Sequence, residues 1–418
     1  MTTQLSLSEL FAKQHDKTPN TYNVNIILAA LALLTIGFII ITSASMPVAE
    51  RLHGNPYHFA LRHGIYIVLA LLAGMITLNL PMQFWRSTNP YLMLAALLML
   101  VAVLIIGRTV NGSTRWIVVG PITVQAAEPA KLFFFLYLAG YLVRRYEQVN
   151  ESMRGFFKPL IIYGLFAGLL LLQPDLGTVI VMFTTTLGLL FLAGAKLWQF
   201  FSLIFTGVAS IVFLIVYSEY RRNRIIGFLD PWADPFGTGY QLTQSLMAYG
   251  RGSWFGQGLG NSLQKLAFLP EAHTDFIMAI LAEEFGYVGV LIVLLLLFYM
   301  IIAALRLGNA AISLQRPFEA FTAYAIGIWF CLQTAVNIGA STGMLPTKGL
   351  TLPLVSYGGS SLIIMSIAVA LLVRIDFELK VDGVHALRRS SSKSKKKPAA
   401  RQAEKISKTD IADEAVHD

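Results

Sequence analysis

Long apolar runs alternate with short polar segments along most of this 418-residue chain. A membrane-spanning helix needs roughly 17 to 25 mostly apolar residues, because only a helix satisfies its own backbone hydrogen bonds inside hydrocarbon. Ten runs meet this condition, and they predict spans at residues 24–46, 59–79, 90–107, 128–145, 158–173, 176–194, 197–217, 275–304, 318–339 and 353–373. The fifth and sixth runs are divided only by "QPDLG" (173–177), where Pro174 and Gly177 break the helix. The pattern therefore predicts an all-α, polytopic membrane protein with ten transmembrane helices.

Composition supports this prediction, since 56% of the residues are hydrophobic and only 13% are charged. The net charge of +9 does not indicate nucleic-acid binding, because the basic residues lie at the ends of apolar runs and in a tail. The single cysteine, Cys331, has no partner in this chain for a disulfide. The first 23 residues lack the pattern of a removable signal peptide, so the first apolar run is expected to stay as an anchor.

Three regions are predicted: an N-terminal segment (1–23), a membrane domain (24–373) and a basic tail (374–418). The domain contains one large extracytoplasmic loop at 218–274. With ten spans, most Lys and Arg residues lie on the side of both termini, which predicts that both termini are cytoplasmic. The Ser/Lys-rich tail is expected to be disordered and to act as a topology signal near anionic lipid.

Charged side chains inside a membrane must be paired or must face a polar cavity. Glu128 and Lys131 open one predicted span and lie three residues apart, a spacing at which helical side chains can pair. They are interpreted as a structural ion pair; the alternative is that Lys131 lines a cavity that receives an anionic group.

The loop at 220–270 combines basic residues with many aromatic ones, and its "GQGLGNS" lacks the spacing of an ATP-binding P-loop. Arg and Lys beside aromatic rings at the membrane surface instead suit the phosphate headgroup of a lipid. The segment 343–361, rich in Pro, Gly and hydroxyl groups, must be buried in protein or line a cavity, which predicts a site wall.

The stretch "PEAHTDFIMAILAEEFG" (270–286) places Asp275 in the first turn of the eighth span, at its outer end. The carboxylate either interacts with the helix dipole or accepts a proton in catalysis. Burial would raise its pKa and nearby cations would lower it, and the sequence leaves the balance open. Glu283 and Glu284 are expected to pair within the bundle, and His273 lacks neighbours at zinc-ligand spacing.

Six motifs occur in order over residues 32–377: "NGSTRWI" with "QAAEPAKL", "QPDLGT", "DPFGTGYQLTQSLMAYGRG", "GQGLGNS", "LPEAHTDFIMAILAEEFG" and "PTKGLTLPLVSYGGSS". Together they make the chain resemble the SEDS family of bacterial cell-wall polymerases. The last motif, with Lys348, is similar to the cell-division branch of that family. "QAAE" departs from the usual Gln-Pro-Ser/Ala-Glu, although Glu128 and Lys131 match.

The resemblance implies a peptidoglycan glycosyltransferase that polymerises lipid II, a disaccharide-pentapeptide on undecaprenyl pyrophosphate, into β-1,4-linked glycan during cell division. By motif, the catalytic aspartate corresponds to Asp275, which is expected to act as the general base. The residues expected to bind substrate are Arg115, Glu128, Lys131, Gln241, Arg251, Gln257, Lys265, Lys348, Ser356 and Ser360. No metal site is predicted in the protein itself, and a Mg²⁺ or Mn²⁺ ion at the pyrophosphate is the cofactor that the resemblance suggests.

The partners implied are lipid II, a cognate class B penicillin-binding transpeptidase and other membrane proteins of the division machinery, with no nucleic acid. The expected location is the bacterial cytoplasmic (inner) membrane at the division septum. Two alternatives stay open. A lipid II flippase would also use intramembrane charges and a cavity formed by a broken helix, and a non-catalytic division scaffold would need neither.

Overall fold

The computed structural model describes residues 22–110, 113–120, 122–266, 268–346 and 349–382. Its chain divides into two compact units, residues 24–375 and the two terminal segments 1–23 and 376–418. Within the terminal unit, the rings of Tyr22 and Phe377 lie 5.0 Å apart. The part of the basic tail beyond residue 382 lies outside the described residues. The larger unit contains all of the predicted spans.

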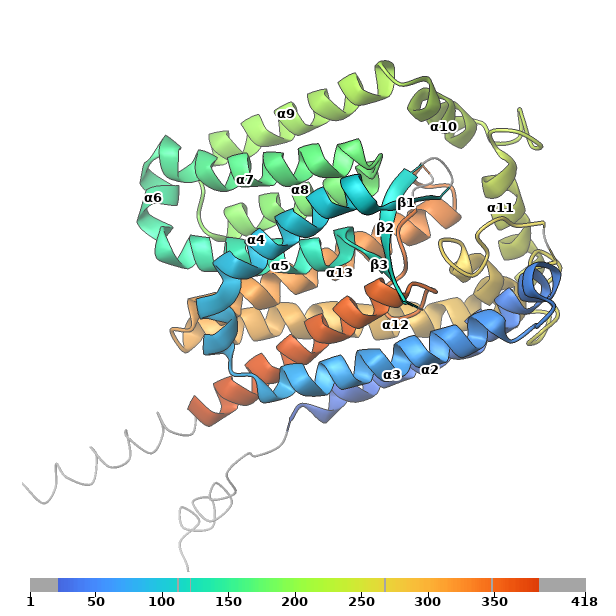
Figure 1. Cartoon of the computed structure of the whole chain (residues 1–418), viewed down its shortest axis with the longest axis horizontal. Helices are drawn as coiled ribbons and strands as arrows, with labels where there is room; N and C mark the ends of the chain where they lie inside the picture. Colours follow the sequence, from blue (N-terminus) through green and yellow to red (C-terminus); the bar gives the residue numbers. More distant parts are fainter. Residues whose placement is uncertain (1–21, 111–112, 121, 267, 347–348, 383–418) are drawn as a thin grey trace, which may run out of the picture. The chain divides into compact units, whose positions relative to one another are not determined.

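Each of the ten predicted spans overlaps a helix in the described part of the chain (Figure 1). The long helices are α2 (Val24–His53), α3 (His58–Asn79), α4 (Met82–Ile106), α5 (Ala127–Arg144), α7 (Met153–Leu172), α8 (Leu176–Leu192), α9 (Leu197–Val216), α12 (Ile277–Ser313) and α13 (Pro317–Ser341). A C-terminal helix begins at residue 359 and includes residue 382. The break between α7 and α8 falls where Pro174 predicted it.

Seven of the described helices are long and apolar enough to cross a membrane: α2, α3, α4, α7, α9, α12 and α13. Helix α8 is apolar but has 17 residues, and α5 carries Glu128, Lys131 and Arg144 within 18 residues. The fold is therefore that of an all-α membrane protein, as predicted, while the count of ten crossings stays a prediction.

Two segments between predicted spans contain regular structure. The first contains a three-stranded antiparallel sheet of β1 (Arg108–Val110), β2 (Ser113–Val119) and β3 (Ile122–Gln125). β-Branched residues favour strands, but these strands have only 3, 7 and 4 residues and lie between much longer apolar runs. The large loop contains α10 (Glu219–Leu229) and α11 (Tyr240–Gly252), and a short helix, α6 (Tyr146–Glu151), precedes α7. One face of α11 is buried, and α11 packs on α12.

Two predicted spans differ from the observed helices in their course. The span at 275–304 was predicted as one helix, yet Gly286 has φ 69° and ψ −169°, so α12 consists of two helical stretches. The span at 353–373 begins as a helix only at residue 359, because the chain is irregular from Pro353 to Gly358 and Leu354 has φ 62°. Periodicity locates apolar segments well but does not show where the backbone departs from a helix inside them.

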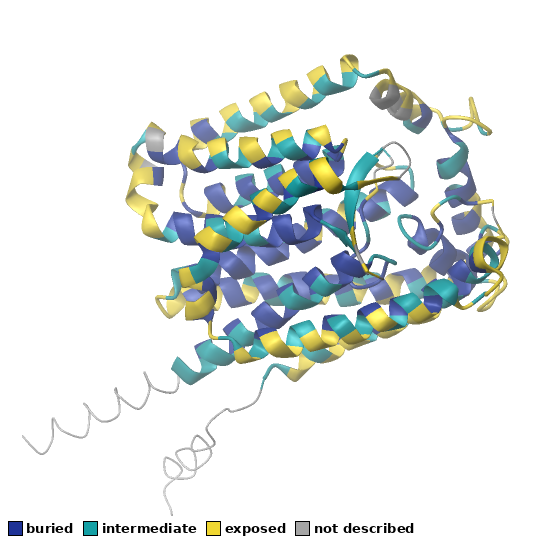
Figure 2. Ribbon diagram, in the orientation of Figure 1, coloured by how far each residue is buried: buried dark blue, intermediate teal, exposed yellow. Residues whose placement is uncertain are grey.

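Helix α13 lies at the centre of the larger unit, where it packs against α12, α8 and α5. Most of its residues are buried (Figure 2). Helix α9 is the opposite case, since Gln199 is its only buried residue. Polar side chains on a helix as enclosed as α13 must find partners within the protein, and these partners define the candidate site.

Candidate functional site

Asp275, the predicted catalytic residue, lies half-buried in the turn directly before α12. The helix begins at Ile277, so the prediction that Asp275 sits in its first turn was wrong by two residues. A Cβ placed on Gly349 would lie 3.1 Å from Asp275 Oδ2, which shows that the carboxylate packs against the backbone of the predicted site wall. A side chain at position 349 would crowd it.

The side-chain amide of Asn337 on α13 joins these two backbone segments. It donates hydrogen bonds to the carbonyl oxygens of Asp275 (3.0 Å) and Leu350 (2.6 Å). One turn earlier, the amide of Gln333 donates to the carbonyl oxygen of Thr351 at 2.8 Å. Residues four apart on a helix share a face, so one face of α13 positions both the Asp275 turn and the wall beside it.

Lys131 of α5 is fully buried, and its side chain contacts the same face of α13. Its Nζ donates to Glu128 Oε1 at 2.9 Å and to Gln333 Oε1 at 3.0 Å, and it lies 5.1 Å from the centre of the Trp329 ring. The predicted ion pair between Glu128 and Lys131 is confirmed. Gln333 therefore connects Lys131 on α5 to the backbone of Thr351, in the segment that packs beside Asp275.

Arg115 on β2 contacts the break between α7 and α8. Its Nε donates to the carbonyl oxygen of Gln173 at 2.9 Å, and its Nη2 donates to that of Pro174. Positive charge is favourable here because the carbonyl groups at a helix C-terminus carry partial negative charge. Asp175 then caps α8 by accepting hydrogen bonds from the backbone N–H and the hydroxyl of Thr178. Arg115 thus attaches the sheet to the break between α7 and α8, and its partners there are uncharged carbonyl groups.

Two predicted substrate-binding serines are buried and accept hydrogen bonds from backbone N–H groups. Ser356 Oγ accepts from the backbone N–H of Leu352 at 2.8 Å, and Ser360 Oγ accepts from that of Gln125 at 3.1 Å. Gln241 is half-buried on α11. Lys348 lies outside the described residues. The substrate-binding roles of these residues stay predictions.

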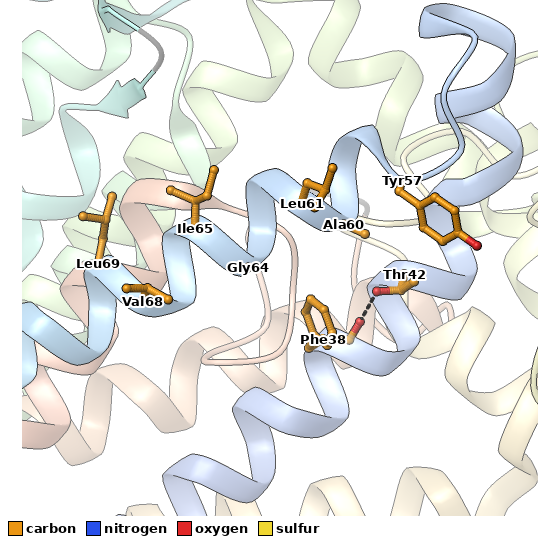
Figure 3. Close-up of a pocket in the computed structure, with 9 residues that line it drawn as sticks. All are labelled: Phe38, Thr42, Tyr57, Ala60, Leu61, Gly64, Ile65, Val68 and Leu69. Atoms are coloured by element: carbon orange, nitrogen blue, oxygen red, sulfur yellow. Dashed lines mark hydrogen bonds between the residues drawn. The ribbon is translucent and has the colours of Figure 1, made fainter.

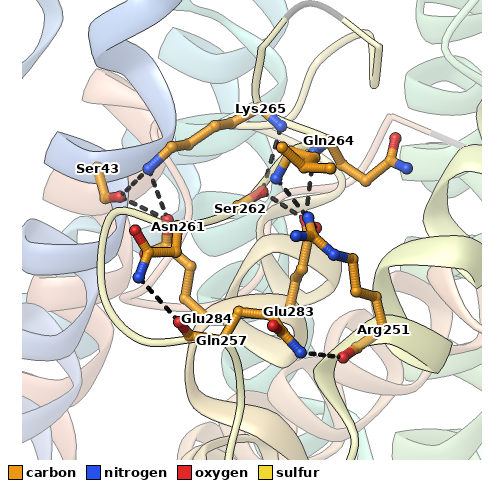
Figure 4. A network of polar contacts seen from close by, with 10 residues as sticks. Ser43, Arg251, Gln257, Asn261, Ser262, Gln264, Lys265, Glu283 and Glu284 are labelled. Atoms are coloured by element: carbon orange, nitrogen blue, oxygen red, sulfur yellow. Dashed lines mark hydrogen bonds and ion pairs between the residues drawn. The ribbon is translucent and has the colours of Figure 1, made fainter.

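Arg251 and Lys265 belong to a second polar cluster, shown in Figure 4. Arg251 pairs with Glu283 at 2.8 Å and Lys265 pairs with Glu284 at 2.7 Å. Both glutamates thus pair within the bundle, as predicted. The exposed Gln257 donates from its side chain to the carbonyl oxygen of Arg251 at 2.7 Å. Both cations of this cluster, which are among the residues expected to bind substrate, therefore form ion pairs with carboxylates of α12.

His273 lies two residues before Asp275 and packs among aromatic rings. Its ring centre is 5.1 Å from that of Phe59 and 5.5 Å from that of Tyr357. Burial lowers the pKa of His273, and the Glu271 carboxylate opposes this shift. The backbone N–H of Tyr357 donates to the carbonyl oxygen of His273 at 3.1 Å, so the turn that holds Asp275 is also fixed from this side.

Two hollows lie at the surface of the described residues, and the second is lined by residues of the polar cluster just described. One is a groove of about 720 Å³ between α2 and α3, with an almost wholly apolar surface (Figure 3). Its lining residues are Phe38, Thr42, Tyr57, Ala60, Leu61, Gly64, Ile65, Val68 and Leu69. The other, of about 470 Å³, is polar and is lined by Arg251, Gln257, Gly260, Asn261, Ser262, Leu263 and Leu266. Asp275 lines neither of them.

Two residues that organise the site, Gln333 and Asn337, were not predicted from the sequence. Both lie inside an apolar run, four residues apart, and both are buried. Buried amide side chains at helical spacing within a predicted span were a usable signal, because such groups are costly in lipid without partners. The identity of the partners was not readable, since Lys131 lies 202 residues from Gln333 in the chain.

Sequence and structure comparisons identify relatives over most of the chain. A family model described as "Cell cycle protein" (FtsW/RodA/SpoVE) matches residues 23–381. A probable peptidoglycan glycosyltransferase FtsW from Alteromonas naphthalenivorans is 70% identical over 400 residues, which cover 94% of this chain and 78% of that protein. The protein of the same description from Escherichia coli O157:H7 is 52% identical over 370 residues, covering 88% and 89% of the two chains.

Two solved structures share the fold. One, described as the structural coordination of polymerization and crosslinking by a peptidoglycan synthase complex, matches with a TM-score of 0.69 at 27% identity and covers 85% of this chain and 98% of that one. The other, Rod shape determining protein RodA of Thermus thermophilus, matches with a TM-score of 0.63 at 26% identity, covering 85% and 96%. The chain belongs to the FtsW/RodA/SpoVE family of cell cycle proteins, the SEDS family.

Proposed function

We propose that this protein is a peptidoglycan glycosyltransferase that polymerises lipid II during cell division, with Asp275 as the general base. The observation that carries the proposal is the position of Asp275. Its carboxylate is half-buried beside Gly349, and its backbone is hydrogen-bonded to Asn337. The FtsW relatives described as probable peptidoglycan glycosyltransferases support the reaction class.

In the proposed reaction, the 4-hydroxyl oxygen of the acceptor's GlcNAc attacks the anomeric carbon of the lipid-linked MurNAc on the growing chain. A new carbon–oxygen bond forms there as the bond to pyrophosphate breaks, and the configuration inverts to give a β-1,4 linkage. The hydroxyl proton passes to Asp275, and undecaprenyl pyrophosphate leaves. A positioned carboxylate is suited to this task because it accepts the proton as the oxygen attacks.

The departing pyrophosphate develops negative charge that a fixed cation stabilises more in the transition state than in the ground state. Among the described candidate cations, Lys131, Arg251 and Lys265 each pair with a carboxylate. Arg115 differs, because its hydrogen bonds go to neutral carbonyl groups. Arg115 is therefore the first candidate to bind the leaving pyrophosphate, because its guanidinium can hold phosphate oxygens bidentately.

A divalent cation enters this proposal only as an ion that the pyrophosphate brings with it. Among the described residues, no group of three or more His, Cys, Asp or Glu side chains is placed to hold a metal. Mg²⁺ is commonly bound through one or two carboxylates together with substrate phosphates.

The proposed setting is the bacterial cytoplasmic membrane at the division septum, with both termini in the cytoplasm. A cognate class B penicillin-binding transpeptidase and other division proteins are the proposed partners. The structural neighbour described as a peptidoglycan synthase complex supports a partnered enzyme.

The proposal is tested with purified protein, its cognate transpeptidase and fluorescent lipid II, comparing the parent with Asp275→Ala and Asp275→Asn. We expect polymer from the parent and a loss on the order of 10²- to 10⁴-fold in both variants, because general-base catalysis contributes about that much. Headgroup translocation without any polymer would instead support a flippase. Normal division of an Asp275→Ala strain would support a scaffold.

A further inference from the structure

Asp275 lies near the middle of a chain segment whose two ends are joined by an ion pair. This segment, residues 265–284 with residue 267 outside the described part of the chain, is called the arch. Lys265 Nζ lies 2.7 Å from Glu284 Oε1, and both side chains are almost completely buried. Their charges therefore interact in a poorly solvated place, where attraction between opposite charges is strong. The arch is a closed loop, with Asp275 ten residues from one end and nine from the other.

The neighbouring residue Glu283 closes the arch a second time (Figure 4). Its carboxylate accepts hydrogen bonds from Ser262 Oγ (2.5 Å) and from the backbone N–H groups of Leu263 (3.0 Å) and Gln264 (3.3 Å). Arg251 adds an ion pair at 2.8 Å. The chain just before the arch is thus fixed to the last residues of the arch through charge-assisted hydrogen bonds.

One side chain from a distant helix joins the closed base. Ser43 of α2 donates to Glu284 Oε1 at 2.7 Å and accepts from Lys265 Nζ at 2.8 Å. Near the middle of the arch, the side-chain amide of Asn337 donates a hydrogen bond to the carbonyl oxygen of Asp275. The arch is therefore attached to α2 at its base and to α13 beside Asp275.

The helix break at Gly286 separates the end of the arch from the rest of α12. Because Gly286 is not helical, the stretch that ends at Phe285 is not held in line by the rest of α12. Its position depends on side-chain contacts and on the backbone of the preceding loop, whose Gln257 and Gly258 N–H groups donate to the carbonyl groups of Glu283 and Glu284.

We infer that Lys265 and Glu284 are positioning residues, which set the place of Asp275 by closing the arch and fixing it to Ser43. The inference rests on the proposed function, in which Asp275 takes the proton. It gives Lys265 a role different from direct substrate binding. The Lys265 ammonium is buried between a carboxylate and a hydroxyl, so contact with a phosphate would require it to leave these partners.

The test uses the double variant Lys265→Met/Glu284→Gln in the full chain with its cognate transpeptidase. Removing both charges together avoids an unpaired buried charge, which would be strongly destabilising. We expect a folded protein whose kcat for lipid II polymerisation falls by on the order of 10²-fold while KM changes little, since misplacement of a reacting group by about 1 Å costs a comparable factor. Ser43→Ala, which keeps the ion pair, should lower kcat in the same direction but by less.

A distance measurement reads the position of the arch without using activity. Spin labels are placed at two exposed sites, Phe268 on the arch and Leu52 on α2, in a Cys331→Ser background. We expect a narrow distance distribution in the parent and a broader or displaced one in the double variant. A control pair at Leu52 and Leu61, which joins α2 to α3, should not change.

The matched control variant is Arg316→Met/Glu319→Gln, which removes an ion pair of 2.9 Å at the start of α13. It should leave both kcat and the arch distance unchanged. An unchanged distance in the Lys265/Glu284 double variant would overturn the inference, as would a broadened distance with unchanged kcat. A raised KM with unchanged kcat would overturn it in favour of substrate binding by Lys265.

The failure of the proposed function is distinguishable from these outcomes. If Asp275→Ala retained polymerisation, the general-base role of Asp275 would be wrong. Lys265 and Glu284 would then have no catalytic base to position. The distance measurement would still show whether Lys265 and Glu284 close the arch. Two results together support both proposals. Asp275→Ala must inactivate the protein, and the separate Lys265→Met/Glu284→Gln variant must show a lower kcat and a broadened arch distance.

Discussion

Lys131 is a buried cation whose charge is balanced by one carboxylate. Its side chain is fully buried and that of Glu128 is 5% exposed. Removing one member of such a pair leaves an uncompensated buried charge, which typically costs about 3–5 kcal/mol. We therefore expect Lys131→Met to lower the thermal midpoint of the detergent-solubilised protein strongly.

The double variant Glu128→Gln/Lys131→Met is the matched control for this prediction, because it removes both charges and keeps similar side-chain volumes. It should recover most of the lost stability. If the single and double variants were equally destabilised, the ion pair would not be the source of the effect, and the contacts of Lys131 with Gln333 and Trp329 would have to account for it.

Residue by residue, the sequence was informative where partners are close in the chain. The pairing of Glu128 with Lys131 follows from a spacing of three residues on a helix. The partners of Glu284 could not be predicted, since Ser43 lies 241 residues away and meets Glu284 only through the packing of α2 on α12. For the same reason, Lys265 and Arg251 looked available for substrate, although the structure pairs both with glutamates.

At the scale of an element, the break in α12 depends on one glycine. Gly286 has a positive φ with an extended ψ, and a Cβ at this position would lie 2.4 Å from the carbonyl oxygen of Trp254. Side chains at such backbone angles cost about 1–3 kcal/mol from strain alone, and the close contact adds to this. Gly286→Ala should therefore lower the thermal midpoint of the purified protein.

Gly250 provides the matched control, because it lies within α11 and a Cβ there would meet nothing within 4 Å. Alanine is the better helix former by up to about 1 kcal/mol, so Gly250→Ala should leave stability unchanged or raise it. A Gly286→Ala protein as stable as Gly250→Ala would show that α12 can continue as one helix, which the sequence pattern had predicted.

The stability of the fold should depend on pH through His273, which lies in the arch. Burial lowers the pKa of His273 in the folded protein, opposed by the carboxylate of Glu271. The unfolded chain binds a proton with the ordinary pKa near 6.5, so it takes up protons more readily than the folded one as pH falls. The histidine therefore does not weaken the fold above about pH 6.5 and destabilises it progressively below that value.

The measurement is the thermal midpoint of the parent and of His273→Gln between about pH 7.5 and pH 5.5, a window that brackets the ordinary histidine pKa. Glutamine cannot take up a proton, so the variant should lose less stability than the parent on acidification. Equal losses would mean that other titrating groups account for the acid response and that His273 is accommodated in its charged form.

For the molecule as a whole, hydrophobicity predicted the membrane fold because burial in lipid and burial in protein both select apolar residues. That shared selection also limits the prediction. Helix α5 is mostly buried in protein and carries charged residues, whereas α9 is exposed along nearly its whole length. The pattern assigned both to the same class, and only the packing shows that α5 helps build the site.

The orientation of the molecule in the membrane can be tested by the accessibility of two of its loops. With ten crossings and cytoplasmic termini, the loop between α10 and α11 faces outward and the link between α12 and α13 faces the cytoplasm. In a Cys331→Ser background, Phe236→Cys should react with a membrane-impermeant thiol reagent in intact spheroplasts. Ser313→Cys should react only after permeabilisation; both positions are exposed. The reverse pattern would put Asp275, which follows the outer loop, on the wrong side for lipid-linked sugars. Reaction of both sites in intact spheroplasts would mean that α12 does not cross.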